Sequence, residues 1–276
     1  MSNKNIDYYV VDVFTDKVFG GNPAGVCLLD EWLPDDILQN IAMENNLSET
    51  AFLVKQERSS DKKTCYNLRW FTPTIEIDLC GHATMGSAYV LFNFVETASS
   101  KIEFHTLSGI LTVEKQDDML WMDLPSRPPV PAEKYGCIQK ALDIKKFDVY
   151  KSADILIVVD SEETVKSVNP DFQILKEIKE EAKMPGDNFV VIITAPGTDC
   201  DFVSRVFAPN CGVDEDPVTG RAHCVLTPYW SQRLNKKSLT ARQLSNRGGQ
   251  LWCEDEGERV KIGGKTILYL QGKINI

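Results

Sequence analysis

The chain carries one short pattern twice, and this duplication limits the folds that it can adopt. Residues 69–73 read Arg-Trp-Phe-Thr-Pro, and Cys80 stands seven residues after that proline. Residues 205–209 read Arg-Val-Phe-Ala-Pro, and Asp216 stands seven residues after that proline. The two arginines are 136 residues apart in a chain of 276 residues. We therefore predict two related halves that face each other across a cleft, with Cys80 on one wall and Asp216 on the other.

Two further matches support the repeat. Pro34-Asp35 and Pro170-Asp171 are again 136 residues apart, and residues 108–114 resemble residues 248–254. Solenoid repeats are about 20–50 residues long, so two long copies predict a two-lobed globule instead. We place the N-terminal lobe at residues 1–126 and the C-terminal lobe at residues 127–276, with the last strand able to return to the first lobe. The proline-rich residues 127–131 are the linker candidate.

Each copy of the pattern runs into an apolar stretch that predicts a central helix. Residues 81–94 are apolar on nearly every side, and residues 221–234 are similar up to Trp230. A helix that is apolar all round is buried. Further helices are predicted at 34–45 and from Pro170, and strands at 8–14, 25–29, 50–55, 66–71, 101–106, 109–115, 119–124, 155–159, 189–194 and 202–207. We predict an α+β fold of two pseudo-symmetric lobes, each a curved mixed or antiparallel sheet wrapped around a central buried helix.

Charge and cysteine usage exclude several classes of function. A formal net charge of −10 argues against general binding to nucleic acid or to an anionic membrane. No stretch approaches the 18 apolar residues of a membrane span, and the N-terminus lacks the apolar run of a secretory signal. The eight cysteines form no Cys-x-x-Cys pair and the three histidines are dispersed. We therefore expect a cytoplasmic protein with reduced thiols and no dedicated metal site.

The starts of the two central helices are candidate binding positions. The first turn of a helix offers free backbone N–H groups and the positive end of the helix dipole, which together attract carboxylates. Gly81 stands at one start and Gly220 at the other, and both allow close backbone approach. The alternative is that both helix starts serve only to cap their helices and to allow close packing. The pairing of the two starts favours a small carboxylate-bearing ligand.

The candidate acid/base groups are few. They are Glu49, Cys80, His82, Asp216 and Glu215. Each has a plainer alternative: a solvated carboxylate for Glu49, a helix cap or satisfied imidazole for His82, a helix N-cap for Asp216 and an inert buried thiol for Cys80. We expect His105 and His223 to be structural.

At these residues the chain resembles the phenazine-biosynthesis PhzF-like family, within the diaminopimelate-epimerase-like fold. The matching stretches extend over essentially the whole chain: residues 12–15, 20–26, 48–52, 69–73, 76–84, 215–220 and 243–249. The segments Cys-Gly-His-Ala-Thr at 80–84 and Glu-Asp-Pro-Val-Thr-Gly at 215–220 are highly specific in combination.

The resemblance implies a cofactor-independent isomerase whose site lies between two lobes, and family members are often homodimers. Glu49, in the Ser-Glu-Thr-Ala-Phe motif, would move a proton between carbons of an unsaturated carboxylic acid. A partly apolar site can raise the pKa of such a carboxylate toward neutrality. His82 and Asp216 would orient the substrate and relay protons. Asn22, Cys80, Gly81, Thr219, Gly220 and Arg221 would contact the substrate.

Two departures from the family pattern matter. Arg221 stands where a serine often follows Thr-Gly, and it would either pair with an extra substrate carboxylate or phosphate or face solvent. Cys80 stands where related racemases and epimerases carry one of two catalytic cysteines, and we match the second position to Asp216. The two-thiol mechanism is therefore not expected. An epimerase or racemase that uses Cys80 with a carboxylate remains an alternative, as does a non-catalytic binding or interaction protein on the same fold.

Overall fold

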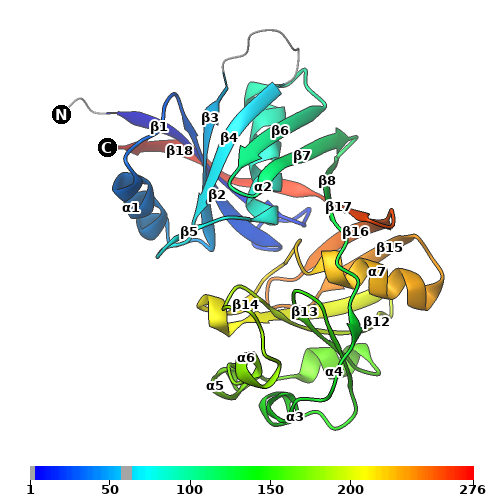
Figure 1. The fold of residues 1–276 in the computed structure, drawn as a ribbon. Helices are drawn as coiled ribbons and strands as arrows, with labels where there is room; N and C mark the ends of the chain where they lie inside the picture. Colours follow the sequence, from blue (N-terminus) through cyan, green and yellow to red (C-terminus); the bar gives the residue numbers. More distant parts are fainter. Residues whose placement is uncertain (1–3, 57–63) are drawn as a thin grey trace. The chain divides into compact units, whose positions relative to one another are not determined.

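A computed structural model describes residues 4–56 and 64–276, which form two compact units (Figure 1). The N-terminal unit comprises the residues up to Asp123 together with Gly263–Ile276, and the C-terminal unit comprises Leu124–Ile262. Among the described residues, no helix is both long enough and apolar enough to cross a membrane.

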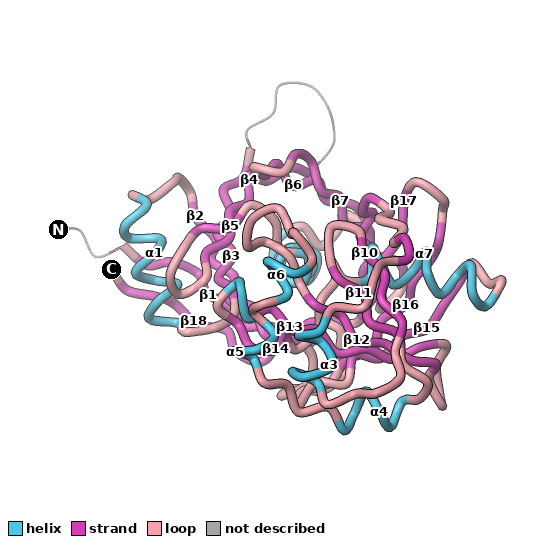
Figure 2. The backbone as a smooth tube through the Cα atoms, turned by 60° about the horizontal axis from the view of Figure 1, so that its bottom comes forward, coloured by secondary structure: helices cyan, strands magenta, loops and turns pink. Residues whose placement is uncertain are grey.

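Within its described residues, the N-terminal unit is a mixed sheet with two α-helices. Its elements are β1 (Asn5–Val13), β2 (Asn22–Leu29), α1 (Asp35–Asn45), β3 (Glu49–Lys55), β4 (Thr64–Phe71), β5 (Glu76–Ile77), α2 (Gly81–Val90) with a π-helical turn (Leu91–Val95), β6 (Lys101–Thr106), β7 (Gly109–Gln116), β8 (Met119–Pro125) and β18 (Thr266–Asn275). The pairings run β18–β1–β2–β3–β4–β6–β7–β8, with β5 on β4. Strand β18 lies beside β1 in both views (Figures 1 and 2).

Helix α2 is the core of this unit. It contacts β1, β2, β3, β7 and β18, and every residue of α2 from His82 to Val90 except Tyr89 is buried. The helix is apolar on all sides because strands surround it, and Figure 1 shows it enclosed by the strands of its unit. It ends at Val90, earlier than the predicted 81–94, where the π-helical turn begins.

The C-terminal unit repeats this plan with more helices. Its elements are β9 (Val130–Pro131), α3 (Gly136–Leu142), β10 (Asp148–Lys151), β11 (Ile155–Val158), α4 (Glu162–Ser167), α5 (Phe172–Leu175), α6 (Ile178–Glu181), β12 (Val191–Pro196), β13 (Phe202–Ala208), a 3₁₀ turn (Pro209–Cys211), β14 (Val213–Asp216), α7 (His223–Leu234), β15 (Ser238–Gln243), β16 (Gly249–Asp255) and β17 (Arg259–Gly264). Figure 2 shows α3 to α6 as short helical segments joined by loops. The sequence pattern did not predict α3 or α4.

The order and direction of strand pairing confirm the predicted duplication. In the C-terminal unit the pairings run β9–β10–β11–β12–β13–β15–β16, with β14 on β13. The parallel pairs β2–β3 and β4–β6 of the first unit recur as β11–β12 and β13–β15. The predicted α+β fold with a central buried helix in each half is thus confirmed.

The proline-rich segment 127–131 is part of the C-terminal unit. The Arg127 amide donates to the Cys224 carbonyl, and Val130–Pro131 pairs with β10. The chain passes from one unit to the other inside β8, after Asp123, and again inside β17, after Ile262. The segment that we predicted as the linker therefore lies just after this boundary, within the C-terminal unit.

Gly86 lets α2 approach the strands closely. A Cβ at this position would lie 2.8 Å from Val11 Cγ2 and 3.3 Å from Val13 Cγ2. We expect Gly86→Ala to lower the free energy of unfolding by about 1–3 kcal/mol, because overpacking a buried contact strains the core. Urea unfolding measures this effect. Gly136→Ala is the matched control, since its nearest atoms lie 3.9 Å away on the flexible Glu181 side chain, and equal stability of the two variants would contradict the prediction.

Candidate active site

Glu49 is the first residue of β3 and stands at the end of a β–α–β crossover. Helix α1 stops at Asn46, which adopts the left-handed conformation with φ 49° that asparagine tolerates at a helix end. The chain then enters β3, which pairs in parallel with β2 so that Glu49 is in register with Ala24. This crossover holds the Glu49 side chain in a mostly buried position, with 17% of the side chain exposed.

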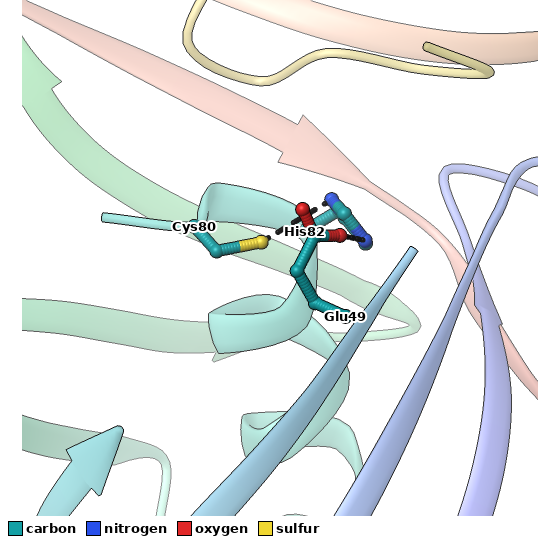
Figure 3. Close-up of side chains that lie close together, drawn as sticks. All are labelled: Glu49, Cys80 and His82. Atoms are coloured by element: carbon teal, nitrogen blue, oxygen red, sulfur yellow. Dashed lines mark hydrogen bonds and ion pairs between the residues drawn. The ribbon is translucent and has the colours of Figure 1, made fainter. Parts of the chain in front are cut away.

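His82, in the first turn of α2, lies between Glu49 and Cys80 (Figure 3). Glu49 Oε2 and His82 Nε2 are 3.1 Å apart, and Cys80 Sγ lies 3.5 Å from His82 Nδ1. Asn22 Nδ2 is 3.3 Å from the same Nδ1. Both His82 and Cys80 are buried. The contact between Glu49 and His82 is close but is not aligned as a hydrogen bond, so each of these two atoms is buried without an aligned partner among the described residues.

The protonation states in this cluster follow from burial and charge. Burial, and then the charge of Glu49, raise the pKa of the Cys80 thiol to about 11, although His82 acts in the opposite direction. The thiol is therefore neutral at neutral pH. For His82, burial alone lowers the pKa, but Cys80 and Glu49 together outweigh burial and raise it well above its usual range. Cys80 contributes more than Glu49 to this rise in the pKa of His82.

This assignment gives a pH dependence of stability. The pKa of His82 is higher in the folded chain than its usual value of about 6.5. The stability that protonation adds is therefore fully present below about pH 6.5 and is lost as the pH rises through the folded-state pKa. We expect the difference in unfolding free energy between the native chain and His82→Gln to shrink as the pH rises. Urea unfolding of both proteins over a pH series measures it. A constant difference would show that folding leaves the pKa of His82 unchanged, and a difference that grows with pH would show that His82 is neutral in the folded chain.

The C-terminal unit contains a second polar cluster at the segment that leads into α7. Thr219 Oγ1 donates to Asp216 Oδ2 over 2.5 Å. Gln243 is completely buried and holds this segment from β15: its Nε2 donates to the Asp216 carbonyl and to Thr219 Oγ1, and its Oε1 accepts from the Thr219 amide. Since Gln243 donates to Thr219 Oγ1, the single proton of the threonine hydroxyl is directed at Asp216.

A duplicated ion pair shows which residues of the two units correspond. Arg69 binds Glu76 through Nε and Nη2, each over 2.7 Å. Arg205 binds Glu215 in the same way, over 2.7 Å and 2.9 Å. Strand β5 therefore corresponds to β14, and Glu215 corresponds to Glu76. Glu215 thus forms an ion pair that matches the one formed by Glu76.

Counting onward from these glutamates, the second copy is displaced by three residues relative to our alignment. Cys80 corresponds to Thr219, and Gly81 corresponds to Gly220. Two contacts at matching positions of the two copies support this. Thr84 Oγ1 donates to the Cys80 carbonyl, and His223 Nδ1 lies 2.9 Å from the Thr219 carbonyl. The prediction that Cys80 and Asp216 occupy matching positions is therefore wrong. The residue that matches the Cys80 thiol is the Thr219 hydroxyl.

In the same correspondence between the two copies, Arg221 matches His82, and both side chains meet a carboxylate. The Arg221 guanidinium donates to Asp154 Oδ1 over 2.9 Å and to the side chain and carbonyl of Asn188. Asp154 is completely buried and also accepts from the Val190 amide. Arg221 thus belongs to an ion pair within the fold, an outcome that neither of our two expectations for this residue included.

The structure brings the predicted residues together in two groups. Asn22, Glu49, Cys80 and His82 form one cluster in the N-terminal unit, beside Gly81. Asp216 and Thr219 form the other in the C-terminal unit, beside Gly220. His223 is buried, and burial lowers its pKa to about 4, which agrees with the structural role expected for it. The sequence did not predict Gln243 as the hydrogen-bond partner of Asp216 and Thr219. The one signal was that Gln243 lies in a stretch, residues 243–249, that matches the family.

Comparisons with known proteins agree with this fold along the whole chain. The family model described as phenazine biosynthesis-like protein (PhzC-PhzF) matches residues 11–272. An uncharacterized isomerase of Pseudomonas aeruginosa is 46% identical over 272 residues, which cover 98% of this chain and 99% of that protein. The crystal structure of a phenazine biosynthesis protein of the PhzF family from Enterococcus faecalis superposes with a TM-score of 0.92 at 44% identity, covering 99% of this chain and 100% of that one.

A more distant structure extends the likeness in fold. A predicted epimerase from Pseudomonas aeruginosa superposes with a TM-score of 0.75 at 17% identity, covering 98% of this chain and 99% of that one. At that identity the comparison shows a shared architecture and no more. The family model and the close relatives together show that the chain belongs to the PhzC/PhzF family of phenazine biosynthesis-like proteins.

Proposed function

We propose that the protein is a cofactor-independent isomerase that moves a proton on a small, unsaturated, carboxylate-bearing metabolite, with Glu49 as the general acid/base. The observation that carries the proposal is the buried contact between Glu49 and His82. Glu49 at this position lies against an imidazole whose pKa is raised, so a proton donor is within reach of its carboxyl group.

In the proposed reaction, the Glu49 carboxylate removes a proton from a carbon next to the conjugated system of the substrate. The electron pair shifts along the conjugated carbons, and the protonated Glu49 returns the proton to a different carbon. The double bond moves, and neither an oxidant nor a second reactant is needed. His82 stabilises the carboxylate at the start and at the end of this cycle, while the neutral Cys80 thiol donates or accepts only weakly.

The N-terminus of α2 supports a carboxylate-bearing substrate. Cys80, the residue before the helix, makes no side-chain capping hydrogen bond. The first turn, beginning at Gly81, therefore has backbone N–H groups and a positive dipole end that can bind a substrate carboxylate. For Asp216, Thr219 and Gly220 we keep the role that the family resemblance implies, which is to orient the substrate through carboxylate, hydroxyl and backbone groups.

Epimerisation through Cys80 is the second candidate, favoured by the contact between its thiol and His82. The pKa of about 11 makes Cys80 a poor base at neutral pH, and the matching residue Thr219 cannot serve as a second thiol. This candidate requires that Cys80→Ala abolish turnover. The isomerase proposal requires that Cys80→Ala keep proton exchange while Glu49→Gln loses it.

Incubation in deuterium oxide with a panel of small unsaturated and amino carboxylic acids, followed by proton NMR, tests the proposal. We expect one class of unsaturated acid to lose a proton signal, gain deuterium and change the position of its double bond. Binding without exchange, seen as line broadening that survives in Glu49→Gln, would favour a non-catalytic binding protein and overturn the proposal.

A further inference from the structure

A second cluster of metal-ligating side chains lies on the sheet of the N-terminal unit, away from α2. Cys65 stands on β4, and Glu103 and His105 stand on β6. One sulfur, one carboxylate oxygen and one imidazole nitrogen from these residues all lie within 4.8 Å of one another. The contact between Cys65 Sγ and Glu103 Oε2 is 3.6 Å.

The pairing of β4 with β6 creates this cluster. The two strands are parallel, with Cys65 in register with Glu103 and Asn67 in register with His105. Glu103 and His105 are two residues apart on β6, so their side chains point to one face of the sheet. Phe104, between them, is completely buried on the opposite face. Three side chains that are up to 40 residues apart in sequence therefore meet on one side of two adjacent strands.

The donor set is that of zinc. Thiolate, imidazole and carboxylate are the ligands that proteins use for Zn²⁺, whereas Mg²⁺ and Ca²⁺ prefer oxygen alone. Bonds of about 2.0–2.3 Å in a tetrahedral zinc site place neighbouring ligand atoms about 3.3–3.8 Å apart. The sulfur–oxygen distance already falls in this range. Glu103 and His105 are half-buried, so small changes of their side-chain rotamers can bring the third ligand closer.

One nearby cation on β6 is already paired with a carboxylate. Lys101 lies on the same face of β6, two residues before Glu103, and its ammonium group binds Glu114 over 2.7 Å. Its charge is therefore largely compensated. The chain as a whole carries a formal net charge of −10, which attracts cations.

We propose that Cys65, Glu103 and His105 bind one zinc-class divalent cation, which links β4 to β6 and stabilises the N-terminal unit. The wide separation of these residues in the sequence is the reason that we expected no metal site. The register of the parallel strands β4 and β6 makes the three residues neighbours in space. This site is distinct from the cluster of Glu49, Cys80 and His82, and it does not depend on the proposed isomerase activity.

Calorimetric titration of the reduced, metal-free chain with Zn²⁺ tests the proposal, with Co²⁺ as a coloured substitute. We expect one tightly bound Zn²⁺ per chain, a higher melting temperature with Zn²⁺, and a cobalt–thiolate charge-transfer band. Cys65→Ser should remove the band and weaken Zn²⁺ binding at least about 100-fold, and Glu103→Gln and His105→Gln should each weaken it at least about 10-fold.

Cys80→Ser is the matched control, because it removes the thiol of the second cluster with a suitable donor set that the described residues contain. It should leave zinc affinity and the cobalt band unchanged. Absence of stoichiometric binding to the native chain would overturn the proposal. So would binding that Cys80→Ser abolishes, or binding that Cys65→Ser and the half-buried Glu103→Gln both leave intact.

Discussion

Replacing Glu49 by glutamine should abolish proton exchange into the substrate while leaving the fold in place. Glutamine has nearly the same shape as glutamate but cannot take up a proton at neutral pH. General acid/base groups contribute about 10²–10⁴-fold to a rate, so we expect the exchange rate to fall by that factor. Time-resolved proton NMR in deuterium oxide, with the compound that the native chain exchanges, measures it.

Glu114→Gln is the matched control for this result. Glu114 is a partly exposed glutamate on β7 that pairs with Lys101, so the same chemical change there should leave the exchange rate unaltered. Glu49→Asp separates the two contributions of the group, because it keeps the carboxylate but moves it by one methylene. We expect partial activity in Glu49→Asp, since the position of a base matters as well as its charge. Full activity in Glu49→Gln would remove Glu49 from the mechanism.

The duplicated architecture could be predicted because short sequence motifs occur in both halves of the chain. Repeated matches in the same order indicated two halves, and the predicted helix 81–94, apolar on nearly every side, indicated a sheet wrapped around it. The cluster of Glu49 and His82 could also be predicted, but only through the family resemblance. Nothing in the spacing of these two residues places their side chains 3.1 Å apart, because that contact depends on the β2–α1–β3 crossover.

The correspondence between the two halves could not be predicted in full. The chain after β13 makes a 3₁₀ turn, Pro209–Cys211, that closes at Gly212 with φ 84°. This turn lengthens the second copy, so counting from the proline matched Asp216 to Cys80 in the alignment of the two copies. The true match appears only in tertiary contacts, in the two Arg–Glu pairs and their strand registers. A sequence alignment of two short motifs has no information on such a turn.

The other features that the sequence did not predict are contacts between residues that are distant in sequence. Gln243 reaches Thr219 from β15, and Asp154 reaches Arg221 from 67 residues away. Both partners are fully buried polar residues. A buried polar side chain requires a partner, but the sequence does not say which residue supplies it. The parallel pairing of β13 with β15 and of β11 with β12 decides that.

Loss of the ion pair between Arg221 and Asp154 should have the second large effect, a fall in stability. Arg221→Ser, which introduces the residue that the family often carries here, should lower the free energy of unfolding by about 3 kcal/mol. Asp154 is completely buried, so removal of the guanidinium leaves a carboxylate without its cation in a site that excludes water. For a unit of this size that corresponds to a fall in melting temperature of about 6–12 °C, which calorimetry measures.

The double variant Arg221→Ser with Asp154→Asn distinguishes a lost ion pair from lost packing. Asparagine at 154 still accepts a hydrogen bond from the Val190 amide, but it carries no charge to leave unpaired. We expect the double variant to recover more than half of the stability that Arg221→Ser loses. If both variants are equally unstable, packing of the Arg221 side chain is the cause. If Arg221→Ser is as stable as the native chain, the ion pair contributes nothing, and Arg221 would again be a candidate for contact with the substrate.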